Sequence, residues 1–139
     1  MYFRKNQNAY LLRLVKGEEV IKTLSSFVDE QKILGGFVFG LGAFKDLTLG
    51  YYDSTKKEYI KKFIRDDLEF GNLTGSIAYV EGKPFVHAHV SVAGSDMKAF
   101  CGHLFSATIS GTGEFMVIPS ESKVERKPDP ETGLKLLDL

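Results

Sequence analysis

The sequence is poor in the features that define several common classes of protein. It contains a single cysteine, Cys101, so no disulfide bond can form within the chain. No stretch approaches the ~20 apolar residues that a membrane-spanning helix needs, and no secretory signal pattern opens the sequence. These absences lead us to expect a cytoplasmic protein that does not enter a membrane.

The sequence also lacks an excess of charge of either sign. Lys plus Arg and Asp plus Glu number 18 each, so the formal net charge is zero. A domain that grips duplex DNA normally has a basic excess, because neutralised phosphates supply much of its affinity. The basic residues between Lys56 and Arg65 are followed directly by Asp66, Asp67 and Glu69, which favours a solvated hairpin over a nucleic-acid patch. We therefore expect weak or absent DNA binding.

The chain has enough apolar material for one hydrophobic core. It has 139 residues, 43% of them hydrophobic, and no repeat or low-complexity linker divides it. We expect a single domain over residues 1–139, with its core at about 8–119. The segment 120–139, which contains Pro128 and Pro130, is predicted to be an irregular C-terminal strap over the surface.

One segment has the periodicity of an amphipathic helix. Apolar residues recur on one helical face: Val20, Leu24, Phe27 and Val28. This predicts a helix from about Glu18 to Gln31 with that face against the core. Gly17 is expected near its N-cap, and Gly35 with Gly36 is expected to end it, because glycine adopts the left-handed conformation without strain.

The other apolar segments have the length and composition of strands. The expected strands are Ala9 to Leu14, Gly36 to Leu41, Leu47 to Tyr52, Glu58 to Ile64, Glu69 to Val80, Phe85 to Ala93 and Ser106 to Ile118. One helix followed by many strands predicts an α+β fold, with a mostly antiparallel sheet and the main helix packed on it.

All three histidines fall in one short stretch of the sequence. Because residues i and i+2 point to the same face of a strand, His87 and His89 should project together. His103 follows fourteen residues after His89, far enough to return on a neighbouring strand. Three imidazoles suit zinc or another divalent ion and leave a fourth position for water. The alternative is that these histidines only make structural hydrogen bonds.

Cys101 and two acidic residues bear on the chemistry of such a site. If Cys101 and His103 share a strand face, a thiolate would close a four-ligand structural site, whereas a small buried Cys101 would leave the site open. We favour the open site. Glu69 is the candidate acid or base beside the metal, with Glu114 as a second candidate, and both are otherwise plain surface carboxylates.

Several motifs spread over almost the whole chain resemble the PPC (plant and prokaryote conserved) domain family, which in plants is fused to AT-hook DNA-binding motifs. They are Tyr10-Leu11-Leu12-Arg13-Leu14 with Gly17-Glu18, Gly40-Leu41-Gly42-Ala43, Leu49-Gly50-Tyr51-Tyr52-Asp53, Leu73-Thr74-Gly75, His87-Ala88-His89-Val90, Gly102-His103-Leu104, Glu125-Arg126 and Thr132-Gly133-Leu134. The resemblance is to stand-alone archaeal and bacterial members.

The resemblance implies an α+β fold around an antiparallel sheet and a homotrimer. It also implies that His87, His89 and His103 match the histidines that hold a metal in some prokaryotic members. The chain departs from the family at two positions. It has Cys101-Gly102-His103 where Gly-Gly-His is common, and Asp67 where the plant signature has arginine. It has no Arg-Gly-Arg-Pro core of an AT hook.

These observations lead to three hypotheses about function. The first is a trimeric, zinc-binding domain with a solvent-facing three-histidine site that could receive a small molecule. The second is a DNA-associated regulatory domain, and the third is a structural zinc site that stabilises the trimer. The sequence identifies neither a substrate nor a reaction.

Overall fold

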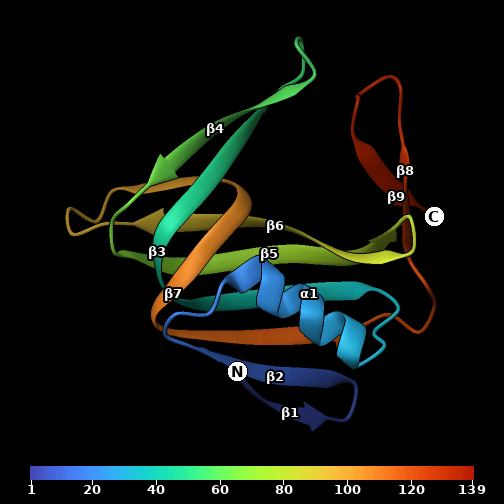
Figure 1. The fold of residues 1–139 in the computed structure, drawn as a ribbon, viewed down its shortest axis with the longest axis horizontal. Coiled ribbons are helices and arrows are strands. Elements are labelled where there is room, and N and C mark those ends of the chain that lie inside the picture. The colour runs from blue at the N-terminus through green and yellow to red at the C-terminus, as the bar shows by residue number, and fades with distance from the viewer.

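The computed structural model describes residues 1–139 as nine strands and one helix (Figure 1). The elements are β1 (Tyr2–Asn6), β2 (Ala9–Val15), α1 (Val20–Glu30), β3 (Gly36–Asp53), β4 (Glu58–Ile64), β5 (Leu68–Val80), β6 (Lys83–Ala93), β7 (Ala99–Pro119), β8 (Glu125–Pro128) and β9 (Lys135–Asp138). No helix is long and apolar enough to cross a membrane.

All nine strands belong to one strongly curved sheet. Its order is β1-β2-β7-β3-β5-β8-β9, with β4 paired to β3 and with β6 paired to both β5 and β7. The pairings β3–β5, β5–β6, β6–β7 and β7–β3 therefore close a ring. All strand pairs are antiparallel except the single bridge between β5 and β8, so the sheet is mixed.

The expectation of an α+β fold is wrong: the protein is mostly β. Strands hold 65% of the residues, and the helix holds only 8%. The prediction overestimated the helix because its apolar periodicity is strong, and it underestimated how many polar segments pair as strands. Tyr2–Asn6 in β1 and Ala99–Phe105 in β7 were not expected to be strands, since neither has sustained apolar alternation.

Helix α1 lies across the inner face of the sheet, where it contacts β6 and β7 (Figure 1). Its buried residues are the four expected ones: Val20, Leu24, Phe27 and Val28. Its ends differ from the expectation. The Glu19 carboxylate, not Gly17, caps the helix by accepting from the Ile21 and Lys22 N–H groups. At the other end Lys32 takes the left-handed conformation with φ 53°, well before the glycines.

The inner face of the sheet and α1 enclose a single apolar core of 25 residues. Inside the ring Phe44 and Phe70 stack at 3.7 Å between ring centroids.

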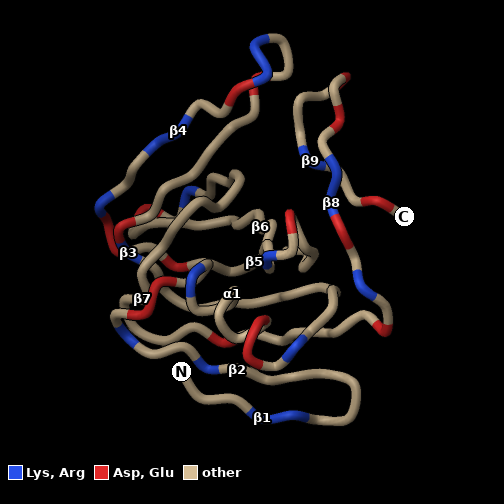
Figure 2. The backbone as a smooth tube through the Cα atoms, turned by 45° about the vertical axis from the view of Figure 1, so that its right-hand side comes forward, with Lys and Arg blue, Asp and Glu red and all other residues tan.

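The charged residues are mixed along the chain: Lys and Arg are interspersed with Asp and Glu along the backbone (Figure 2). Alternation along the strands then leaves the outer face of the sheet to carry the residues that can meet ligands or partners.

The segment after Pro119 is not the irregular strap that its prolines suggested. Strands β8 and β9 pair as an antiparallel hairpin, from Glu125 opposite Asp138 to Pro128 opposite Lys135. Residue Glu125 also bridges to Tyr79 of β5. The C-terminal hairpin, residues 125–138, therefore continues the sheet beyond β5.

Candidate metal centre

The strand pairings bring the three histidines together on the outer face of the sheet. His87 and His89 are two residues apart on β6, and His103 of β7 is directly opposite His89. One ring nitrogen from each of the three lies within 4.8 Å of the others. We call His87, His89 and His103 the histidine site.

Packing fixes the three rings to different degrees. His103 is 9% exposed, His87 is half-buried, and His89 is exposed. His103 packs against Tyr59 and Phe105 at ring-centroid distances of 4.9 and 4.6 Å. Its Nδ1 atom is buried without a hydrogen-bond partner. In the tautomer that carries its hydrogen on Nε2, the lone pair of this Nδ1 atom has no competing protein donor and can bind a metal ion.

A glycine on the neighbouring strand makes room for this packing. Gly50 of β3 is opposite His103, and a Cβ atom there would overlap the Phe105 ring and crowd Tyr59. Both aromatic rings can therefore close over His103, which accounts for its burial.

The electrostatic surroundings keep two of the imidazoles neutral. Burial is the main reason that the pKa of His87 is lowered to about 4, and Arg126 and His89 lower it further. The pKa of His103 is also lowered to about 4, by burial first and then by His87, His89, Lys61 and Arg126. Because only neutral imidazole binds a metal ion, both rings are ready ligands at neutral pH.

Arg126, from the C-terminal hairpin, reaches the site although no role was predicted for it. Its Nη2 atom lies 3.3 Å from His87 Nδ1 and donates to Ser76 Oγ at 2.8 Å. Its Nη1 atom donates to the Lys135 carbonyl oxygen at 2.8 Å. Burial lowers the pKa of Arg126, while nearby Tyr59 opposes that change. Apart from the family motif Glu125-Arg126, no pattern in the sequence indicated this contact.

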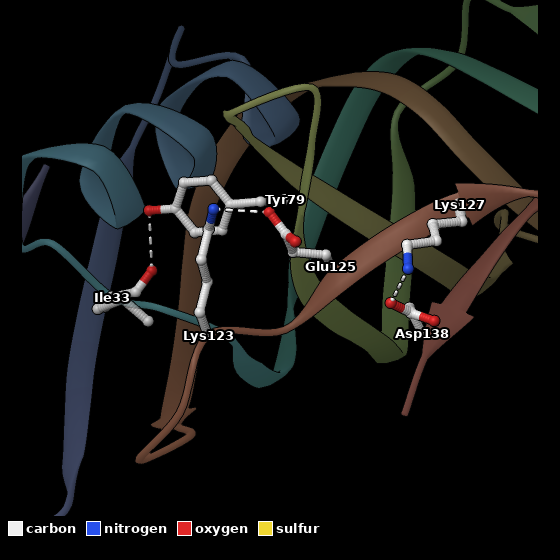
Figure 3. A network of polar contacts seen from close by, with 6 residues as sticks. All are labelled: Ile33, Tyr79, Lys123, Glu125, Lys127 and Asp138. Carbon is white, nitrogen blue, oxygen red and sulfur yellow. Dashed lines mark hydrogen bonds and ion pairs between the residues drawn. The ribbon is translucent and has the colours of Figure 1, made fainter.

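Three contacts lie within or next to the C-terminal hairpin, two of them drawn in Figure 3. The Tyr79 backbone N–H donates to the Val124 carbonyl oxygen at 2.8 Å. The Tyr79 hydroxyl donates to the Ile33 carbonyl oxygen at 3.2 Å, and Lys127 Nζ lies 2.6 Å from Asp138 Oδ2 (Figure 3). Glu125 and the preceding Val124 thus hold the hairpin to Tyr79 of β5, and the Val124 N–H donates to the Leu34 carbonyl oxygen at 3.0 Å in the segment after α1.

The structure does not bring the other predicted residues into the histidine site. Cys101 is exposed and lies opposite Ser91, two pairs along the strands from His89 and His103. It is not among the residues whose ligand atoms converge. Glu69 is exposed and opposite Ala93, four residues along β6 from His89, which is about 13 Å in a strand.

Glu114 is also remote from the histidines. It lies on β7 between Arg13 of β2 and Leu41 of β3, at the far side of the sheet. Neither predicted acid therefore has a place beside the imidazoles, and the cationic Arg126 stands there instead.

An exposed apolar area lies on the same outer face, separated from the histidines by β5. Paired residues share a face, so the row from His89 runs through Thr74 of β5 to Phe39 of β3. It continues to large exposed apolar side chains on the neighbouring strands. We call these residues the apolar stretch: Leu11, Phe37, Phe39, Met116 and Ile118. A hollow of about 650 Å³ opens among some of them.

Comparison with known families gives a match over most of the chain. Residues 1–121 match the family model of the Plants and Prokaryotes Conserved (PCC) domain. A curated relative, the bifunctional protein GlmU of Synechococcus sp. (strain JA-3-3Ab), is 33% identical over 127 residues. That match covers 89% of this chain but only 19% of the relative.

Solved structures with the same fold include a metal-containing protein and a candidate DNA-binding protein. A metal-containing protein from Archaeoglobus fulgidus is 36% identical, with a TM-score of 0.86, 97% of this chain covered and 95% of the other. A candidate DNA-binding protein from Bacteroides thetaiotaomicron is 35% identical, with a TM-score of 0.95, 99% of this chain covered and 96% of the other.

Proposed function

The chain belongs to the Plants and Prokaryotes Conserved (PCC) domain family, as its motifs suggested, and on that premise we propose that it is a metal-binding member. His87, His89 and His103 hold one divalent ion, with zinc the expected one. The site faces solvent, and the chain assembles as a homotrimer.

The observation that carries this proposal is the convergence of three imidazole nitrogens within 4.8 Å. The donor set suits zinc, which takes histidine nitrogen at ~2.0–2.1 Å in tetrahedral sites. The unpartnered Nδ1 atom of His103 and the lowered pKa values of His87 and His103 also fit a metal ligand set. The similar protein from Archaeoglobus fulgidus contains a metal.

The same geometry supports an open site. Three neutral imidazoles leave the charge of a divalent ion uncompensated and one tetrahedral position free. His89 is exposed, so this position can be reached by water or a small molecule. Because Cys101 lies outside the converging group, it does not supply a fourth ligand.

Metal analysis of untagged protein grown with zinc tests the proposal. We expect about one zinc ion per chain in the wild type and a sharp loss in His89→Ala, because this exposed ring can be removed without disturbing the core. Cys101→Ala, two pairs along the same strands, is the matched control and should keep its zinc. Equal loss from both variants would show a cysteine-containing structural site, and a metal-free wild type would refute metal binding.

The apolar stretch supports the proposed trimer. Phe39 is 40% and Phe37 52% exposed, and Met116 and Ile118 are each 42% exposed, side by side on paired strands. Contiguous exposed apolar residues on this scale are typical of protein interfaces. A second copy of the chain is the expected occupant, since the resemblance to the family implies a homotrimer.

A structural zinc that stabilises the trimer is the alternative, because the histidine site and the apolar stretch share one face. Removing the metal distinguishes the two. In our proposal the apolar contact holds the trimer, so chelation with EDTA leaves the assembled mass unchanged. Under the alternative, chelation would lower the mass toward that of the monomer.

A DNA-associated role is the second candidate function, favoured by the similarity to a candidate DNA-binding protein. The charges of this chain give it little support. Basic and acidic residues alternate along the backbone, and the formal net charge is zero (Figure 2). We propose that any contact with DNA is weak.

A further inference from the structure

A pocket opens beside the histidine site where β6 and β7 separate. Their pairing ends at His89 and His103. The residues of β6 before His89 do not pair with the residues of β7 after His103. The pocket in this fork has a volume of about 340 Å³, within the range of small-ligand sites. One side is formed by the strands, and the other by residues 133–136 of the C-terminal hairpin.

Most of the pocket wall is apolar. Eight of its thirteen lining residues are hydrophobic. Phe85 and Phe105 contribute from β6 and β7, and Leu134 and Leu136 from the hairpin. Such a wall favours a ligand whose body is apolar, because each apolar group that enters the pocket leaves water.

The polar end of the pocket carries positive charge without a neutralising partner. No Asp or Glu lines it. Arg126 makes no salt bridge: Nη1 donates to the Lys135 carbonyl oxygen, Nη2 donates to Ser76 Oγ and lies 3.3 Å from His87 Nδ1, and the buried Nε atom has no partner. Lys61 lies nearby, 3.9 Å from the centre of the Phe105 ring.

A half-buried guanidinium beside an apolar wall is costly unless an anion joins it. Its planar fork of N–H donors matches a carboxylate in shape and charge. A phosphate, being more strongly hydrated, would suit the apolar wall less well. A focused positive field in a cleft with low-dielectric walls also raises the local concentration of anions.

We propose that this pocket binds a small carboxylic acid with an apolar or aromatic body, whose carboxylate is held by Arg126 beside the histidine site. The location of the ligand next to the metal rests on the proposed function. The guanidinium and the apolar wall are present without the ion. Arg126 lies just beyond residues 1–121, which match the family model.

Calorimetric titration of the full, zinc-loaded chain with three probes tests the pocket on the unaltered protein. Phenylacetate should bind at least about tenfold more tightly than acetate, because the ring adds apolar contact. It should also bind at least about tenfold more tightly than phenylacetamide, which has the same shape but no charge. An amide that binds as tightly as the acid would overturn the proposal.

Two variants test whether Arg126 is the positive charge that binds the carboxylate of phenylacetate. Arg126→Gln should weaken phenylacetate binding at least about tenfold, while Lys127→Gln, which removes a positive charge from the next residue of β8, should leave it within about twofold. Zinc content, measured in parallel, should be the same in both variants. Equal phenylacetate affinity in wild type and Arg126→Gln would contradict the proposal, whichever metal content is found.

Zinc content separates this inference from the proposed function. If the wild type takes up no zinc, metal binding is refuted, and the same titrations are made on the metal-free protein. Charge-dependent phenylacetate binding that is lost in Arg126→Gln would then still support the pocket. No binding by the metal-free or the zinc-loaded chain would refute it.

Discussion

The histidine site and the apolar stretch lie on one outer face of the same sheet, one strand apart, yet they offer different chemistry. At the histidine site, ring nitrogens converge and a guanidinium lacks an anionic partner. Across β5, the apolar stretch offers uncharged, apolar side chains such as Phe39 and Met116. The first area is suited to an ion and a small anion, and the second to another protein surface.

Exposure on the outer face of this sheet does not by itself define what a residue binds. Strand alternation places His89, Thr74, Phe39 and Met116 in one row of outward side chains. What separates the two areas is the curvature of the sheet. Because β6 turns back to pair with β7, it brings His103 against His87 and His89, whereas β2, β7 and β3 stay side by side.

The largest expected effect is loss of the trimer when the apolar stretch is altered and the histidine site is left unchanged. Phe39→Glu places a charge in the middle of the apolar stretch, so the mass in light scattering should fall from about three times 15.5 kDa to 15.5 kDa. Zinc content should not change. Glu69→Gln, on the exposed end of β5, is the control and should leave the assembled mass unchanged. A wild type that is already a monomer at micromolar concentration would contradict the trimer.

A smaller effect is expected from acid on the metal-free protein. The folded-state pKa of His87 and of His103 is lowered to about 4, from 6.5 in the unfolded chain. Between these values the unfolded chain binds more protons, so stability is full above pH 6.5 and is lost as the pH falls toward 4. Since about 1 kcal/mol shifts Tm by roughly 4 °C in a domain of this size, we expect a decrease of ~5 °C or more.

His103→Gln sharpens this acid test, because it removes one of the two titrating rings. The Tm of the metal-free variant should fall less between pH 6.5 and pH 4 than that of the wild type. Identical pH profiles for the two proteins would show that the buried imidazole does not couple to folding.

The smallest effect is expected from DNA. Random duplex should bind more weakly than the ~10⁻⁴–10⁻⁶ M that is usual for non-specific binding, because the net charge is zero and the basic residues are interspersed with acidic ones. Fluorescence anisotropy at two salt concentrations measures this. A salt-sensitive, submicromolar complex would show that the basic residues of β4 act as a nucleic-acid surface.

Local patterns in the sequence predicted much of the fold. The strand Glu58–Ile64 and the buried face of α1 were predicted correctly, because strand and helix periodicity are local signals. Gly36–Asp53 was expected as two strands but forms one. The register of β3 shifts between Gly40 and Gly42 against β5, and between Lys45 and Thr48 against β7. The sequence irregularities that suggested a break between two strands are therefore bulges within one continuous strand.

The candidate site was predictable in part for the same reason. The shared face of His87 and His89 follows from the two-residue repeat of a strand. The pairing of His89 with His103 depends on the register between β6 and β7, which is not a local property. Arg126 could not be predicted, because it reaches His87 from a four-residue strand with little periodicity and 39 residues away.

X-ray absorption spectroscopy at the zinc edge of the purified protein tests the central claim most directly, since it identifies the atoms bound to the ion. An open three-histidine site predicts only nitrogen and oxygen neighbours at ~2.0–2.1 Å, with the multiple-scattering pattern of imidazole rings. The spectrum should not change in Cys101→Ala. A sulfur neighbour at ~2.3 Å, or a protein without zinc, would contradict the account.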